Sequence, residues 1–105
     1  MNIKGEITFP GDKSISHRAL ILASLSNRES IIHNISTGSD VESTRKCLIE
    51  CGINSAKQND YVRISGGTFK SPKKALDCGN SGTTARLLVG LLAGQGIPAS
   101  FIGDQ

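Results

Sequence analysis

Residues 9–20, FPGDKSISHRAL, join a strand-like segment to a helix-like one. The preceding segment, NIKGEITF at 2–9, alternates as a strand does, and Pro10 and Gly11 end it. The following segment, ISHRALILASLS at 15–26, has apolar residues at helical spacing. The inward face that this spacing predicts consists of Ile15, Ala19, Leu22 and Ala23. A strand that passes through a short turn into a helix is typical of α/β proteins.

The rest of the chain continues this alternation of strands and helices. The predicted strands are 29–36, 61–65, an extended piece around Phe69, a short strand within 74–82 and a last strand at 97–104. The predicted helices are 39–52 and 83–94. The order is β-α-β-α-β-β followed by β-α-β, which predicts an α/β fold.

The two later helices carry different signals. In SDVESTRKCLIECG at 39–52, Ser39 and Glu42 fit a capping box, and Gly52 is a C-terminal stop. Between them, Val41, Thr44, Leu48 and Cys51 form a stripe at helical spacing. In TTARLLVGLLAG at 83–94, apolar residues lie nearly all round the helix, so we expect this helix to be buried.

Composition excludes several classes of protein. The 105 residues carry a net charge of +3 and 4% aromatic residues without a basic run, which argues against nucleic acid as a partner. No run of about 18 apolar residues is present, so we expect no membrane span. The first residues lack the apolar core of a signal peptide. The three cysteines are an odd number, and we interpret them as reduced thiols in a cytoplasmic protein.

A pattern of glycine, small polar residues and arginine occurs twice. Gly11 precedes Arg18 by seven residues, and Gly79 precedes Arg86 by seven, at an offset of 68 residues. Such an offset indicates a supersecondary unit used more than once. We therefore divide the chain into a strand and crossover at 1–10, a first unit at 11–72 and the start of a second unit at 73–105. A unit that ends midway cannot bury its sheet alone, so residues 1–105 are expected to be part of a larger protein.

The first turn is a candidate anion site. Free N–H groups at a helix start attract anions, and Lys13 and Arg18 add positive charge while Ser14 and Ser16 add hydroxyl donors. The alternative is that one of the serines caps the helix and both cations are solvated. A nucleotide P-loop is disfavoured, because Asp12 and Ile7 occupy the two positions where that motif requires glycine.

The second turn, DCGNSGTTAR at 77–86, has similar chemistry. Gly82 has no side chain, so a ligand can approach its backbone, although Ser81 or Thr83 can equally be a helix cap. Other candidates are weaker. Cys47 and Cys51 at i, i+4 are interpreted as core thiols rather than a metal pair.

Some remaining residues have no clear role from the sequence. We expect Cys78 to be buried and inert and His33 to be structural. The roles of His17 and Asp40 stay open.

The segments PGDKSISHRALILASLS and LDCGNSGTTARLLVGLLAG resemble the two N-terminal signatures of the 3-phosphoshikimate 1-carboxyvinyltransferase (EPSP synthase) family. The intervening TGSDVESTRKCLIECG is similar as well, so the resemblance covers nearly the whole chain. It implies an N-terminal fragment of a two-domain enzyme, an inside-out α/β barrel built from β-α-β-α-β-β repeats. Such enzymes are cytoplasmic, and we expect the full-length enzyme to be a monomer.

The family's activity is the transfer of the enolpyruvyl group of phosphoenolpyruvate to the 5-hydroxyl of shikimate 3-phosphate, with release of phosphate. This step leads to chorismate and the aromatic amino acids, proceeds through a tetrahedral intermediate, needs no metal or organic cofactor and is the target of glyphosate.

The resemblance also implies roles for individual residues. Lys13 is the catalytic candidate and contacts both substrates, while Ser14 and Arg18 hold shikimate 3-phosphate. Gly82 passes close to phosphoenolpyruvate, and Asn80 and Thr83 support that turn. Arg86 is expected to be structural.

Two alternatives remain beside this assignment. One is the sister family, UDP-N-acetylglucosamine 1-carboxyvinyltransferase, whose first turn typically has lysine–asparagine where this chain has Lys13-Ser14. The other is a non-catalytic phosphate-binding fragment. The family's remaining site residues lie beyond Gln105, so we expect residues 1–105 alone to be inactive.

Overall fold

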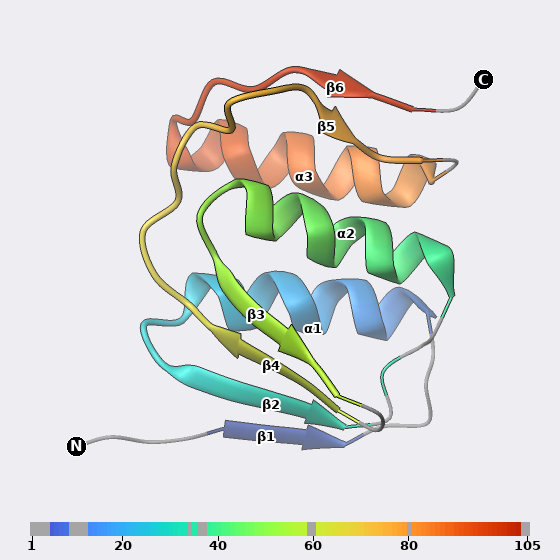
Figure 1. Ribbon diagram of the computed structural model, residues 1–105, viewed down its shortest axis with the longest axis vertical. Helices are drawn as coiled ribbons and strands as arrows, with labels where there is room; N and C mark the ends of the chain where they lie inside the picture. Colours follow the sequence, from blue (N-terminus) through green and yellow to red (C-terminus); the bar gives the residue numbers. More distant parts are fainter. Residues whose placement is uncertain are drawn as a thin grey trace.

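Helices and strands alternate along the described part of the chain, as predicted (Figure 1). The computed structural model describes residues 5–8, 13–33, 35, 38–58, 61–79 and 81–103, and side chains from residue 15 onward. In chain order the elements are β1 (Gly5–Thr8), α1 (Lys13–Leu25), β2 (Glu29–His33), α2 (Ser39–Glu50), β3 (Asn54–Lys57), β4 (Tyr61–Ser65), β5 (Leu76–Asp77), α3 (Gly82–Gln95) and β6 (Phe101–Ile102).

The strands form two separate sheets. The larger has the order β1-β2-β4-β3, with β1 and β2 parallel and the other neighbours antiparallel. The smaller consists of the parallel pair β5 and β6. In each sheet one parallel pair is connected through a helix, as β1-α1-β2 and as β5-α3-β6. Helices α1 and α3 therefore occupy equivalent places, each between two parallel strands.

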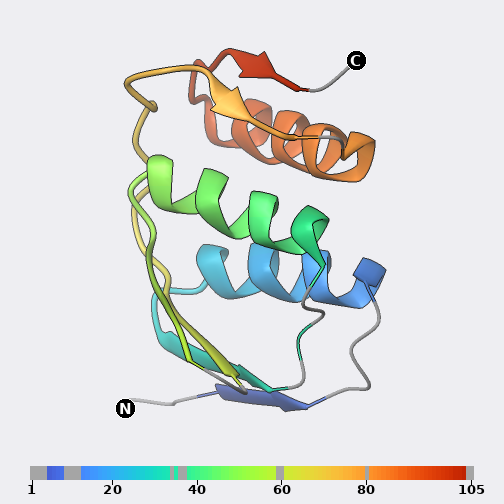
Figure 2. The ribbon, with the colours of Figure 1, turned by 45° about the vertical axis from the view of Figure 1, so that its right-hand side comes forward.

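The three helices lie side by side with α2 between α1 and α3, and all three run in the same direction (Figures 1 and 2). The larger sheet lies beyond α1, and the β5–β6 pair lies beyond α3. Since the helices are parallel, their N-terminal ends face the same side of the molecule. This arrangement brings the ends of α1 and α3 close to one another despite their distance in sequence.

A continuous apolar core joins the helices to both sheets. Its most deeply buried members are below 2% exposed and include Leu20, Ile32, Leu48, Ile64 and Leu88. Burying a side chain of this size stabilises the fold by about 1.5–3 kcal/mol.

The predicted pair of strands after α2 was partly wrong. The extended piece around Phe69 is not a strand, although the Phe69 side chain is buried in the core at 6% exposed. The partner of β4 is instead β3, which precedes it and pairs Asn54 with Ser65. β3 reads NSAK and is exposed at both ends, so it lacks the apolar alternation that identifies a strand from sequence.

The predicted capping box of α2 was also wrong. The N-cap is Gly38, and no side chain caps the helix. Ser39 is already helical, and the Glu42 carboxylate accepts two hydrogen bonds from the Arg45 guanidinium, at 2.8 and 2.9 Å. This hydrogen bonding lowers the pKa of Glu42. The predicted stop is confirmed, because Gly52 follows the helix with φ of 93°.

The inward face of α1 differs from the predicted one. Ala19 and Ala23 are buried as expected, but Ile15 is 46% and Leu22 65% exposed. Polar residues occupy the inward positions instead, namely Ser16, His17 and Ser24, all at 0% exposed. A hydrophobic pattern alone cannot identify a face on which hydrogen-bonded polar side chains are buried.

Helix α3 is buried on one side only within the described residues. Thr84, Leu88 and Leu92 are buried, while Val89 is 49% exposed. The prediction of a helix buried all round is therefore wrong for this chain.

Candidate functional site

The N-terminus of α3 is built as a helix cap that keeps backbone groups available. Ser81 is the N-cap, and its Oγ accepts the Thr84 N–H at 3.0 Å. Before it, the Gly79 N–H donates to Asp77 Oδ1 at 2.8 Å, and Gly79 has a φ of 57°, which favours glycine. The cap satisfies the N–H group of Thr84, one of the free N–H groups of the first turn. The N–H groups of Gly82 and Thr83, which precede Thr84 in the helix, are not used by this cap. The interpretation of Ser81 as a cap is thus correct, and it is compatible with an anion at the same helix end.

A hollow of about 260 Å³ lies between the N-terminal halves of α1 and α3. Its walls are Arg18 from α1 with Thr83, Arg86 and Leu87 from α3. Both arginines are exposed, and among the described residues neither forms an ion pair or a hydrogen bond. Two guanidinium groups without a carboxylate partner make this hollow electropositive and favour an anionic ligand.

Arg45 shows how a paired arginine differs. Its guanidinium lies 2.8 Å from the Glu42 carboxylate, and that hydrogen bond raises the pKa of Arg45 above its usual range. Nothing comparable balances the charge of Arg18 or Arg86 within the described chain.

A second hollow of about 320 Å³ lies on another side of the same helix end. It is lined by Cys78, Ser81, Gly82, Ala85, Phe101, Ile102 and Gly103. These residues lie where β5 and β6 end, and ligands of α/β proteins bind at the carboxyl ends of parallel strands. A methyl group placed on Gly82 would first meet Nη1 of Arg86, at 3.8 Å. The space next to Gly82 is therefore open to a ligand.

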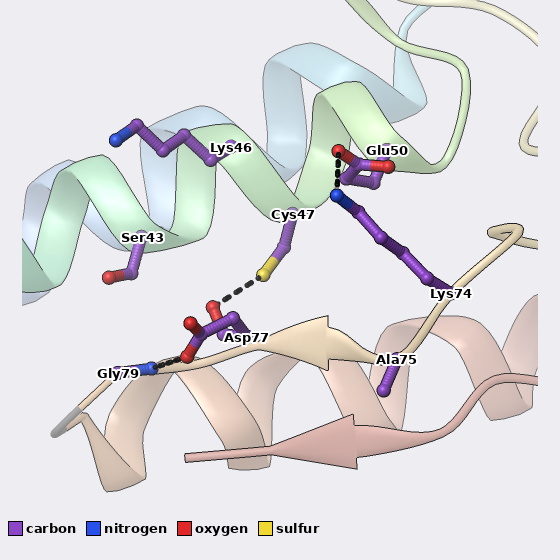
Figure 3. A pocket seen from close by; sticks show the side chains of 8 residues that line it. All are labelled: Ser43, Lys46, Cys47, Glu50, Lys74, Ala75, Asp77 and Gly79. Carbon is purple, nitrogen blue, oxygen red and sulfur yellow. Dashed lines mark hydrogen bonds and ion pairs between the residues drawn. The ribbon is translucent and has the colours of Figure 1, made fainter. Parts of the chain in front are cut away.

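A third hollow, of about 260 Å³, lies between α2 and β5 and is less suited to an anion (Figure 3). Across it, Lys74 Nζ lies 4.0 Å from Glu50, and the Asp77 carboxylate receives the Gly79 N–H (Figure 3). Its charges are balanced by its own walls. None of the described candidate residues Arg18, Gly82 and Thr83 lines it.

A buried row of polar side chains connects the three helices behind the first hollow. His17 Nδ1 lies 2.7 Å from Thr44 Oγ1, which lies 2.8 Å from Thr84 Oγ1. The Thr84 hydroxyl also donates to the Asp40 carbonyl oxygen at 3.1 Å. His17, Thr44 and Thr84 are each 0% exposed. Sequence reasoning missed this row, because its members are 27 and 40 residues apart and carry no common motif.

The structure brings part of the predicted site together. Arg18, Gly82 and Thr83 all lie at the shared end of α1 and α3. Lys13 and Ser14 start α1, but their side chains, and the whole of Asn80, lie outside the described residues. The Ser16 side chain is buried and does not line the hollow. Arg86 was expected to be structural, yet its exposed side chain lines the same hollow as Arg18.

The remaining candidates are part of the core or the sheet. Cys47, Cys51 and Cys78 are buried free thiols, as predicted, and desolvation raises the pKa of all three. His33 on β2 is half-buried and lies 6.0 Å from the Tyr61 ring, consistent with a structural role. None of the described helices is long and apolar enough to span a membrane.

Comparisons with known proteins agree on one family. The EPSP synthase (3-phosphoshikimate 1-carboxyvinyltransferase) family model matches residues 1–105. A 3-phosphoshikimate 1-carboxyvinyltransferase of Streptococcus mutans serotype c is 45% identical over 106 residues, covering 98% of this chain and 25% of the relative. One of Synechococcus sp. (strain JA-3-3Ab) is 47% identical over 97 residues, covering 89% of this chain and 22% of the relative.

A solved structure, EPSP synthase from Acinetobacter baumannii, superposes with a TM-score of 0.83 at 34% identity, covering 98% of this chain and 24% of that one. The chain thus spans about a quarter of the length of these proteins. Since the family model covers every residue, this chain belongs to the EPSP synthase family.

Proposed function

We propose that residues 1–105 are the N-terminal part of an enzyme that transfers the enolpyruvyl group of phosphoenolpyruvate to the 5-hydroxyl of shikimate 3-phosphate and releases phosphate. The family of the chain supports this activity over that of the UDP-N-acetylglucosamine enzyme. The observation that carries it is the hollow between Arg18 and Arg86, next to Gly82. Each substrate bears both a phosphate and a carboxylate, so each suits an electropositive hollow at a helix N-terminus.

The roles follow from charge and access. The Arg18 guanidinium holds shikimate 3-phosphate through one of its anionic groups, since its planar donors match a carboxylate or a phosphate in a bidentate way. Gly82 lets phosphoenolpyruvate approach the start of α3, and Thr83, which lines the first hollow, supports that turn. For Lys13, Ser14 and Asn80 we keep the roles that the family resemblance implies.

The reaction adds the 5-hydroxyl oxygen to C2 of phosphoenolpyruvate while the hydroxyl loses its proton and C3 gains one, which gives the tetrahedral intermediate. The C2–O bond to phosphate then breaks and C3 loses a proton, so the C2=C3 double bond forms again. Bound anions must be held next to each other in this reaction, and their mutual repulsion is offset by cations. Lys13 contacts both substrates in this proposal and is the catalytic residue of the segment. Arg18 and the N–H groups at the start of α3 bind and orient.

We also propose the larger architecture and setting. Residues 11–72 form the first repeat unit and 73–105 begin a second one, within an inside-out α/β barrel, after a strand and crossover at 1–10. The two sheets and the two equivalent β-α-β connections support a repeated unit, whose second copy begins with β5. The full-length enzyme is a monomer, as the family resemblance implies, and it is cytoplasmic, which the free buried thiols favour.

Phosphate release tests the proposal. The full-length enzyme that carries this sequence is expected to release phosphate when shikimate 3-phosphate and phosphoenolpyruvate are both present, and not with either alone. Residues 1–105 by themselves are expected to give only background. A full-length protein that ignores shikimate 3-phosphate but uses UDP-N-acetylglucosamine would show that the sister activity is the right one.

A further inference from the structure

The buried row His17–Thr44–Thr84 is a hydrogen-bonded connection across all three helices. The side chains come from α1, α2 and α3 in that order, with heavy-atom distances of 2.7 and 2.8 Å. All three residues are 0% exposed, so water does not compete for these groups. A hydrogen bond in such surroundings fixes the separation of the elements that contribute to it.

Counting protons gives the row a single direction. A carbonyl oxygen only accepts, so the proton between Thr84 and Asp40 belongs to the Thr84 hydroxyl. A hydroxyl has one proton, so the bond between the two threonines must be donated by Thr44. The Thr44 proton is then used, and His17 must donate to it from Nδ1–H. The direction runs from His17 through Thr44 and Thr84 to the Asp40 carbonyl.

Each end of this row is one residue away from a wall of the first hollow. His17 precedes Arg18, and Thr84 follows Thr83. The Thr84 N–H also donates a hydrogen bond to Oγ of Ser81, the N-cap of α3, at 3.0 Å. A shift of Thr84 therefore moves both the capped turn and Thr83 relative to Arg18.

We propose that Thr44 and Thr84 are positioning residues for the phosphorylated substrate, because their hydroxyls hold the first turn of α3 in register with Arg18 on α1. This inference rests on the proposed function. Neither threonine touches the hollow, so both act through their neighbours. Displacements of about 1 Å in a binding site can change activity by about 100-fold, so the loss of this register is measurable.

The test compares valine and serine at position 44 in the full-length enzyme. Thr44→Val keeps the shape and removes the hydroxyl, whereas Thr44→Ser keeps the hydroxyl. Calorimetry with shikimate 3-phosphate is expected to show a Kd about tenfold higher for Thr44→Val and within about twofold of wild type for Thr44→Ser. In kinetics, KM for shikimate 3-phosphate is expected to rise more than kcat falls.

The matched control is Ser24→Ala. Ser24 is also 0% exposed on α1, but its hydroxyl donates to Ile21 O at 2.7 Å within its own helix. Its removal is expected to leave Kd unchanged. The proposal is overturned if Thr44→Val binds as wild type does, or if Thr44→Ser is as weak as Thr44→Val. If wild type itself binds no shikimate 3-phosphate, the proposed function fails instead.

A second measurement needs no variant and tests the direction of the hydrogen bonds in the row if Thr44→Val does not fold. Nitrogen NMR of neutral His17 in the selectively labelled wild-type enzyme is expected to show the Nδ1–H tautomer. An Nε2–H tautomer would mean that Thr44 donates to His17, and the one-directional connection to α3 would be wrong.

Discussion

Arg18 on α1 and Arg86 on α3 line one hollow, although they are 68 residues apart in the sequence. Each follows a glycine of its own turn by seven residues, at the start of a helix that connects two parallel strands. The helices run in the same direction (Figure 2), so these two equivalent positions lie on the same side of the molecule, where they line the same hollow. The pattern seen twice in the sequence therefore corresponds to two walls of a single electropositive hollow.

Arg86 is expected to contribute to binding rather than to stability. The change Arg86→Ala in the full-length enzyme should raise the Kd for shikimate 3-phosphate by about tenfold, because a charge-assisted contact is worth about 1.5–3 kcal/mol. The free energy of unfolding should stay within about 0.5 kcal/mol of wild type, since the side chain is exposed and has no partner among the described residues. Calorimetry and urea denaturation measure the two quantities.

Arg63→Ala is the control for this change. Arg63 is an exposed arginine on β4, 3.9 Å from Glu29, and it lies away from the hollow. Its removal should alter neither Kd nor stability appreciably. Unchanged affinity in Arg86→Ala would show that Arg86 is merely solvated.

Gly82 is expected to matter for ligand access and not for folding. In Gly82→Ala the new methyl group meets no protein atom closer than 3.8 Å beyond its neighbours, so the enzyme should fold with undiminished stability. The methyl group enters the space that the proposal gives to phosphoenolpyruvate, so KM for phosphoenolpyruvate and the inhibition constant for glyphosate should both rise, by at least about tenfold.

Gly90→Ala is the matched control on the same helix. Gly90 is exposed in the interior of α3, with no atom within 4 Å of an added methyl group. Alanine there should stabilise the protein by about 0.5–1 kcal/mol and leave KM unchanged. If both alanine variants keep wild-type KM values, phosphoenolpyruvate does not approach Gly82.

Because the Cys47 thiol is buried, we expect the folded protein to lose stability in alkaline solution. Burial, aided by the nearby Cys78, raises the pKa of Cys47 from its ordinary value of 9.0 to about 12. The unfolded chain then releases the thiol proton at lower pH than the folded one. The contribution of Cys47 is complete below about pH 9 and falls by up to about 1.4 kcal/mol per pH unit as pH rises toward 12.

Urea denaturation of wild type and Cys47→Ala at about pH 8 and about pH 10 measures this contribution. Alanine creates a cavity and should lower stability at the lower pH, but the further loss on raising the pH should be smaller than in wild type. Equal losses in the two proteins would show that the folded thiol ionises as readily as the unfolded one.

Local sequence signals predicted much of the fold. Val41, Thr44, Leu48 and Cys51 form a stripe at helical spacing, and all four are buried on or just after α2. Gly52 ends that helix with a positive φ, which glycine adopts without strain. Signals of this kind lie within a few residues of the feature that they predict, so tertiary packing did not override them.

Features that depend on tertiary packing were missed. β3 is a polar edge strand that is recognisable only from its pairing with β4. The inward placement of His17 depends on Thr44, a residue 27 positions away on another helix. Arg86 was expected to be structural, because only the parallel arrangement of α1 and α3 lets it share a hollow with Arg18. Distances between helices are not encoded in a single local pattern.

The affinity of the full-length enzyme for shikimate 3-phosphate, with and without the Arg18 guanidinium, tests the central claim most directly. Calorimetry on Arg18→Ala is expected to show a Kd about 10- to 100-fold higher than that of wild type, since a charge-assisted contact to the anionic substrate is lost. Arg18→Lys should fall between them, because it keeps the charge without the bidentate geometry. A wild-type Kd in Arg18→Ala would contradict the assignment of this hollow as part of the shikimate 3-phosphate site.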